Sequence, residues 1–457
     1  MKSSRRQTQR RSVARALLTS QMGRISRIGL IGLIVCSAFC PPSRAEPRVS
    51  GAIAPGPASD GTVLIPGGTF QMGDHHDLGG REHRNDEVPI HEVTLEPYHV
   101  GIHETTNAEY CRFLNAASAR GLITVLGGNV FKNGTETLYC ETRPAVAYSH
   151  LVWDGRRFNV ETGKDRHPVV CIRWEGAVAY CNWLSAEKEL MPCYDLNTWA
   201  CDYTRNGYRL PTEAEWEFAG RGGLHAPYRV YPWGDDADST RANWPNSRDP
   251  YEAGPYPWTT PVGFYNGELR KRSELNWPGQ QSTYRTGDGV NGYGLHDMAG
   301  NVWEWCNDWY TNTYYAAGPS VNPEGPLRGR PMPDGKPYRV LRSGNWYNGA
   351  QGHSRVSNRD PAHFRGPQDP NHPYYHVGFR IVRDAPGDGP RSESGQAKPI
   401  RRAGPRRLPA HTSASCQPTR FKGWQALGTV ATTPPLIETK RREYAVRLPC
   451  GLERTFS

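Results

Sequence analysis

The sequence predicts an α+β fold with little regular secondary structure. Only two long stretches carry a helical pattern, and short apolar segments and turns separate them. With 49 Gly and 39 Pro among 457 residues, long elements are interrupted almost everywhere. The 14 Trp and 23 Tyr residues provide wide apolar surfaces, so a chain of this length can still bury a large core.

Five short strands are expected. Residues 63–65 form an apolar run that ends at a Pro-Gly-Gly turn, and residues 92–98 and 99–102 follow as two further runs. Near the end of the folded part, residues 338–341 and 377–382 have the same apolar character. Such brief strands need side chains, ions or water to satisfy the loop backbone between them.

The two long helical patterns lie in the first half of the chain. Thr106 and Glu109 have the spacing of a capping box, which predicts a helix over residues 106–117. A second helix is predicted over residues 175–189 from an apolar stripe. That stripe consists of Val178, Cys181 and Leu184.

Between these helices, residues 121–165 are hydrophilic and rich in turn residues. We expect a surface excursion of the kind that carries specificity. Thr212 and Glu215 repeat the capping-box spacing ahead of a short helix that bears Trp216 and Phe218.

Residues 1–45 have the features of an export signal. Arginines precede an apolar run over residues 28–40, and Ser43-Arg44-Ala45 offers small residues for cleavage. We expect a secreted, periplasmic or cell-surface protein that starts at Glu46 and has no stable membrane span after cleavage. An uncleaved N-terminal anchor is the alternative. Residues 46–60 form a Pro/Ala/Gly linker.

Charge is distributed unevenly along the chain. The whole chain carries +10, of which residues 1–45 contribute +9 and residues 385–457 contribute +8. Residues 46–384 are therefore acidic, at −7. An acidic folded part suits cation binding and argues against a nucleic-acid-binding core. The basic tail is expected to be disordered and solvated, with attachment to an acidic cell-surface polymer as the alternative.

The run GYGLHDMAGNVWEW, residues 292–305, combines acidic residues, glycines and tryptophans. Asp297 and Glu304 can offer carboxylate oxygens, and Gly300 and Val302 can offer backbone carbonyls. Ca²⁺ takes oxygen donors of both kinds. A calcium-organised loop and an acidic turn with packed tryptophans both fit this spacing.

Six further blocks stand in order with this run, and together they resemble the sulfatase-modifying-factor family, whose best-known members are formylglycine-generating enzymes. The resemblance covers residues 62–384 and implies a C-type-lectin-like fold with structural Ca²⁺. The blocks are VLIPGGTFQMGD (63–74), HPVVCIRWEGAVAYCNWLS (167–185), YRLPTEAEWEFAGRGG (208–223), YPWGDD (231–236), RVLRSGNW (339–346) and VGFRIVRD (377–384).

A second cation site is implied by the resemblance in the segment ANWPNSRDPY. Asn243 and Asp249 would donate side-chain oxygens, and Trp244 and Tyr251 would donate carbonyls. A plain cluster of Asx turns is the alternative.

The family enzymes oxidise a cysteine in a sulfatase with two copper-binding cysteines. The corresponding segment here, residues 344–360, contains no cysteine. Asn348 and His353 occupy the two thiol positions, Asn345 stands where the enzymes usually carry Ser, and Asn358 replaces a further family cysteine. One His beside a neutral amide is a poor Cu(I) site, so we expect no copper. Asn345, Asn348 and His353 are expected to line a polar, unreactive groove.

Three functions follow from these observations. The first, which we favour, is a non-catalytic, calcium-stabilised module that binds an exported peptide, a sulfatase or a glycan. The second is a formylglycine-generating oxidoreductase, which requires Cys306 or a loop cysteine to reach the groove. The third is a metalloenzyme built from the late histidines His353, His363, His372 and His376.

Nine cysteines remain after removal of the signal. Cys193 with Cys201, and Cys416 with Cys450, have spacings that disulfides could close in an oxidising compartment. Cys111 and Cys181 lie in helical patterns and are expected to be buried. The chain has no C-x-x-C pair, so we expect no zinc site.

Overall fold

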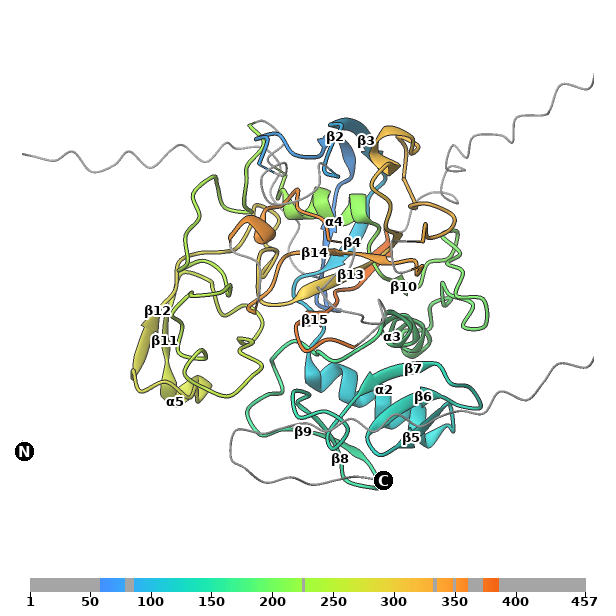
Figure 1. Ribbon diagram of the computed structural model, residues 1–457, viewed down its shortest axis with the longest axis vertical. Helices are drawn as coiled ribbons and strands as arrows, with labels where there is room; N and C mark the ends of the chain where they lie inside the picture. Colours follow the sequence, from blue (N-terminus) through green and yellow to red (C-terminus); the bar gives the residue numbers. More distant parts are fainter. Residues whose placement is uncertain are drawn as a thin grey trace, which may run out of the picture. The chain divides into compact units, whose positions relative to one another are not determined.

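The computed structural model describes residues 58–78, 86–223, 227–331, 335–347, 351–360 and 373–385 (Figure 1). The predictions for the export signal, most of the linker and the basic tail lie outside these ranges. So do those for Asn348, His363, His372, Cys416 and Cys450.

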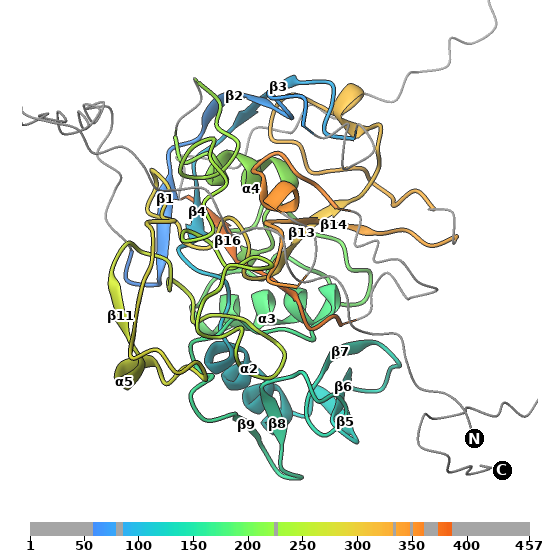
Figure 2. The same cartoon turned by 60° about the vertical axis from the view of Figure 1, so that its left-hand side comes forward.

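The predicted α+β class with low regular content is confirmed, since short strands in small sheets surround a few helices (Figure 2). The helices are α2 (Asn107–Ala119), α3 (Trp174–Glu187), α4 (Glu213–Gly220) and α5 (Arg272–Leu275), with 3-10 turns η1 (Tyr314–Ala316) and η2 (Gln351–Ser354). The strands are β1 (Thr62–Ile65), β2 (Gly68–Met72), β3 (His91–Leu95), β4 (Tyr98–Gly101), β5 (Ile123–Leu126), β6 (Asn129–Lys132), β7 (Leu138–Glu141), β8 (Leu151–Trp153), β9 (Phe158–Val160), β10 (Tyr208–Arg209), β11 (Leu269–Lys271), β12 (Thr283–Arg285), β13 (Trp303–Trp309), β14 (Arg339–Arg342), β15 (Val377–Gly378) and β16 (Val382–Asp384).

Two sheets organise the middle of the fold. One has the order β1-β4-β16-β10, and it joins the first and last strands of the folded part. The other has the order β14-β13-β15, with β13 antiparallel to β14 and parallel to β15. This second sheet brings three of the motif blocks side by side in space.

The predicted helices begin where their caps predict. Thr106 and Glu109 form a complete capping box at α2, and Thr212 and Glu215 form another at α4. These reciprocal bonds satisfy N–H groups that the first helical turn leaves open. Among the described residues, no helix combines the length and the apolar character needed to cross a bilayer.

Three expectations from the sequence need correction. Residues 121–165 contain five short strands, β5 to β9, between their turns, which the sequence did not predict, and these strands lie next to α2 in Figure 1. The turn-rich run ends at Val302, because β13 begins at Trp303 and places Glu304 on a strand. Cys193 and Cys201 are free thiols rather than a disulfide.

Ion pairs hold these elements together inside the core. Helix α4 carries three buried glutamates, and each pairs with an arginine from outside the helix or from its end. Arg359 holds both oxygens of Glu213 at 2.8 and 2.6 Å, and Arg342 reaches Glu217 at 2.6 Å. Buried charges of this kind are tolerated only when they are paired and fully hydrogen-bonded, so the arginines and glutamates depend on one another.

His376, directly before β15, makes the fold sensitive to acid. It is 2 % exposed, and burial lowers its pKa to about 3 from the ordinary 6.5. A histidine whose pKa is lower in the folded than in the unfolded state contributes stability above pH 6.5, and this is lost as pH falls toward 3. Between pH 7 and pH 5 we expect His376 to remove about 2 kcal/mol from the free energy of unfolding.

His376→Gln should abolish this part of the pH dependence, measured as the difference between urea unfolding free energies at the two pH values. His76→Gln, on an exposed histidine, is the control. Equal pH slopes in the wild type and His376→Gln would contradict the assignment.

Candidate functional site

The groove segment begins with a strained turn after β14. Ser343 and Gly344 both have positive φ, at 91° and 75°. A Cβ on Gly344 would lie 2.3 Å from Ser354 Oγ and 3.0 Å from the carbonyl oxygen of His353, so only glycine fits there. The turn therefore holds residues 345–347 against η2.

The predicted groove residues are placed differently from one another. Asn345 is fully buried, and its Oδ1 accepts a hydrogen bond from the Tyr347 amide at 2.7 Å. His353 is half-buried, with its ring 6.0 Å from that of Trp303. Asn358 is buried too, and its Nδ2 donates to Glu87 Oε1 at 3.3 Å. Among the described residues of this set, His353 is the one whose side chain is partly exposed.

An aromatic surface lies beside this segment, and composition alone did not locate it. We call it the tyrosine patch: Tyr148, Tyr256, Tyr347 and Tyr375. The first three are 39 %, 43 % and 42 % exposed. Tyr375 lies between them, with ring centroids 4.7 Å from Tyr148 and 5.3 Å from Tyr347.

Buried rings form the floor of the tyrosine patch. Trp346 is 1 % exposed and lies 5.2 Å from Tyr256 and 5.9 Å from Tyr375. His376 stacks on Tyr347 at 5.6 Å. Burial, followed by its hydrogen bond with Tyr347, raises the pKa of the Tyr375 hydroxyl, so this phenol stays neutral. The patch thus offers flat rings that carry hydroxyl groups.

Cysteine chemistry at this place is restricted by burial. Cys171 packs in the same apolar cluster as Trp346, and Cys140 lies close to it. Both are fully buried free thiols, and burial raises the pKa of each. Cys306 is likewise buried in the main core on β13. A thiol must ionise to act as nucleophile or Cu(I) ligand, so none of the three is prepared for it.

The first predicted cation site sits between β13 and the turn at Ser343. The Asp297 carboxylate accepts from the Gly263 amide at 2.7 Å, and the Gly300 carbonyl accepts from Ser343 Oγ at 3.0 Å. Arg380 binds both oxygens of Glu304, at 2.6 and 2.7 Å. Glu304 is therefore already neutralised by an arginine.

A third carboxylate, Glu104, joins this site although no local sequence pattern indicated it. It is buried, and it accepts from the Val302 amide at 3.2 Å and from Asn301 Nδ2 at 2.7 Å. Burial first, and then the charges of Asp297 and Glu304, raise its pKa well above the usual range. Burial also raises the pKa of Asp297. These three carboxylates with Arg380 leave the site short of positive charge.

The second predicted cation site also lacks positive charge beside a buried carboxylate. Asp249 is buried, and it accepts hydrogen bonds from the Tyr251 amide and the Tyr265 hydroxyl, both at 2.7 Å. Burial raises its pKa to about 6. The Oδ1 atom of Asn243 is buried and has no hydrogen-bond partner among the described residues. An orphaned amide oxygen and a buried carboxylate are both donor types that a hard cation takes.

The two sites are joined through the backbone. Asn301 donates its amide to the Asn243 carbonyl at 2.6 Å, and a Cβ on Gly300 would lie 2.3 Å from that oxygen. Trp244 and Tyr251 accept backbone bonds from Ser247 and Gly254. No three His, Cys, Asp or Glu side chains within the described ranges are grouped to hold a metal, so either site would need carbonyl ligands.

Comparison with known proteins shows what this chain is similar to. The model of the sulfatase-modifying factor enzyme 1-like domain matches residues 50–385. The chain is 33 % identical over 366 residues to the formylglycine-generating enzyme of Streptomyces coelicolor, covering 75 % of this chain and 96 % of that enzyme.

Two further similarities are more partial. The chain is 30 % identical over 296 residues to serine/threonine-protein kinase pkn1 of Chlamydia caviae, covering 64 % of this chain but 34 % of the kinase. The solved structure of Treponema denticola variable protein 1 matches with a TM-score of 0.44 and 22 % identity, covering 70 % of this chain and 94 % of that one. The family match spans almost the whole folded part, and the chain therefore belongs to the sulfatase-modifying factor family.

Proposed function

We propose that this chain is an exported, calcium-stabilised binding module that takes a peptide or a glycan on the tyrosine patch and does not oxidise cysteine. The observation that carries the proposal is the position of the tyrosine patch directly beside the segment that lacks thiols. A surface of exposed rings over a buried aromatic floor is suited to binding.

The chemistry of the rings supports either ligand class. Each exposed tyrosine combines a flat apolar face with a hydroxyl that donates and accepts hydrogen bonds. Sugar rings and peptide side chains stack on such faces, while sugar hydroxyls and peptide amides form hydrogen bonds with the tyrosine hydroxyl groups. Tyr256 and Tyr347 present both features at the edge of the patch.

The absence of cysteine oxidation is supported by the side chains available. His353 offers one imidazole, and Asn345 is a buried amide. Cys171, which packs in the cluster of Trp346, and Cys140 beside it are buried and carry raised pKa values. This combination supplies neither a paired thiolate ligand for Cu(I) nor a thiol that can exchange with a substrate.

Calcium would complete the two acidic sites. Asn243 Oδ1 and the Asp249 carboxylate would hold one ion together with carbonyls of Trp244 and Tyr251. At the other site, Asp297 would share an ion with the carbonyls of Gly300 and Val302, while Glu304 keeps Arg380 across both of its oxygens. The ion would supply positive charge that buried carboxylates there lack.

Adding calcium to protein from which a chelator has removed metal should raise its melting temperature. Asp249→Asn should lose at least half of that rise, because it removes the charge that attracts the ion. At a calcium concentration of about 100 times Kd, one site is worth about 2.7 kcal/mol, so a rise of several degrees is expected by calorimetry. Asp236→Asn, on an exposed residue of the neighbouring loop, is the matched control. A calcium effect that is the same in both variants would rule out this site.

Cysteine oxidation is expected to be absent. The purified protein, incubated with copper, oxygen and a cysteine-bearing sulfatase peptide, should leave the peptide mass unchanged in mass spectrometry. The Streptomyces coelicolor relative serves as the positive control. Detection of the aldehyde product would overturn the non-catalytic assignment while leaving the calcium result intact.

Binding at the tyrosine patch should depend on its exposed rings. In an array of exported-protein peptides and cell-wall glycans, we expect one ligand class to be retained. Tyr256→Ala and Tyr347→Ala should each weaken it about ten-fold, because each removes a contact ring. Leu269→Ala, on exposed β11, is the control. Retention that neither substitution changes would show that the patch is not the binding surface.

A further inference from the structure

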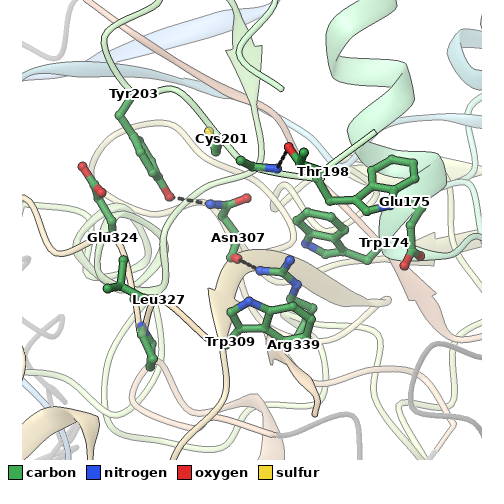
Figure 3. A pocket seen from close by; sticks show the side chains of 14 residues that line it. Trp174, Glu175, Thr198, Cys201, Tyr203, Asn307, Trp309, Glu324, Leu327 and Arg339 are labelled. Carbon is green, nitrogen blue, oxygen red and sulfur yellow. Dashed lines mark hydrogen bonds between the residues drawn. The ribbon is translucent and has the colours of Figure 1, made fainter. Parts of the chain in front are cut away.

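Aromatic rings hold cations in several places in this fold. The clearest case is Arg339, which lies in a cavity of about 360 Å³ between the start of α3 and strands β13 and β14 (Figure 3). Its guanidinium carbon lies 3.7 Å from the Trp174 ring centroid and 3.5 Å from that of Trp309. Nη1 donates to the Asn307 carbonyl at 2.5 Å, as Figure 3 shows. Because ring faces carry negative potential, the two indoles attract the guanidinium from both sides.

Other rings are occupied in the same way by a cationic side chain. The guanidinium of Arg359 lies 4.3 Å from the Tyr315 ring centroid, and that of Arg221 lies 4.9 Å from the Tyr228 centroid. Within the described ranges, by contrast, no Lys or Arg lies over a ring of the tyrosine patch. The patch is therefore an exposed aromatic cluster whose ring faces receive no cation from the described part of the chain.

The rings of the tyrosine patch form inclined walls instead of one flat platform. Tyr347 is inclined at 88° to Tyr256 and at 73° to Tyr375, with ring centroids 6.0 and 5.3 Å apart. Tyr148 continues this arrangement at 44° to Tyr375. A flat group stacks fully on one of these rings, whereas a compact, rounded group can contact two or three of them at once. Cation–π attraction acts within about 6 Å of a ring centroid, so neighbouring rings at these separations can share one cation.

The surroundings of the patch select the kind of cation. The titratable neighbours that act most strongly on the Tyr375 hydroxyl are Tyr347, Tyr148 and Tyr256. The buried Trp346 forms the floor. A cation here would be held by ring faces, not by a carboxylate. A primary ammonium is strongly hydrated and has three N–H donors to satisfy, whereas a quaternary ammonium has none and has apolar methyl surfaces. The patch therefore suits a quaternary ammonium better than a lysine side chain.

We propose that the tyrosine patch recognises a quaternary ammonium group on its ligand. Tyr256, Tyr347 and Tyr375 provide the walls around the methyl groups, and Trp346 provides the floor. The inference rests on the proposed function, because it names the chemical group by which the same surface selects its peptide or glycan. On a peptide this group is trimethyl-lysine, and on a glycan it is a choline substituent.

Isothermal titration of the full chain with choline and with its carbon isostere tests the role of the charge. In the isostere a tert-butyl group replaces the trimethylammonium, so the shape is kept and the charge is lost. We expect choline to bind saturably at or below about 1 mM and the isostere at least ten-fold more weakly. Ethanolamine, with its hydrated primary ammonium, should also bind at least ten-fold more weakly than choline. No saturable binding of choline, or equal binding of choline and either comparison compound, would refute the inference.

Two variants of Tyr256 separate the ring face from the hydroxyl. Tyr256→Leu should weaken choline binding at least ten-fold, and Tyr256→Phe, which restores the ring, should bind choline at least five-fold more tightly than Tyr256→Leu. Tyr284→Leu, on a half-buried ring outside the patch, is the matched control. Equal losses in both Tyr256 variants, or no loss in Tyr256→Leu, would show that these ring faces do not hold the cation. The comparison of choline with its isostere uses the unaltered chain, so it stays decisive if Tyr256→Leu fails to fold.

Paired ligands distinguish the two carriers of the group. A peptide with trimethyl-lysine is compared with the same peptide carrying lysine, and a glycan with phosphocholine is compared with the same glycan without it. We expect the methylated member of one pair to bind at least ten-fold more tightly than its partner. An array ligand that depends on Tyr256 and Tyr347, without any binding of choline, would refute this inference and leave the proposed function standing. Absence of both kinds of binding would refute both.

Discussion

Buried pairing of arginine with carboxylate is the interaction on which this loop-rich fold depends. Arg380 holds Glu304 on β13, Arg359 holds Glu213 at the start of α4, and Arg355 holds Glu87. Each pair joins segments that are far apart in sequence, where short strands offer few ladder bonds. Removing one partner would leave an unpaired charge in the core and would lower the free energy of unfolding by about 3–5 kcal/mol. Each pair therefore contributes strongly to holding its two segments together.

The same rule explains why the acidic sites differ from the rest of the core. Glu213 and Glu304 each have a guanidinium across both oxygens, whereas Asp249 is held by amide and hydroxyl groups alone. Burial therefore raises the pKa of Asp249 to about 6. Asp249 therefore lacks the neutralising arginine that Glu213 and Glu304 have, and the proposed calcium ion would supply that missing charge.

Local signals in the sequence predicted local structure. The capping boxes at Thr106 and Thr212 lie within one helical turn, so their spacing was sufficient to place α2 and α4. The strands in residues 121–165 were missed, because short half-exposed hairpins in a polar stretch show little alternation. Glu104 had no such signal, since its contact with Asn301 spans 197 positions in the chain. Arg339 was visible only as part of a motif, because two strands and a helix together create its indole sandwich.

The separation of the scaffold from its surfaces explains how one family can carry different functions. The ion pairs of Arg342 and Arg359 lie on the buried side of β14 and α4, and they do not require residues 344–348 to be reactive. The absence of cysteine from residues 344–360 therefore leaves these ion pairs intact. The ion-paired scaffold remains, and its exposed loops can change sequence without loss of stability. Shared ancestry therefore predicts the fold, while the side chains at each surface determine the chemistry.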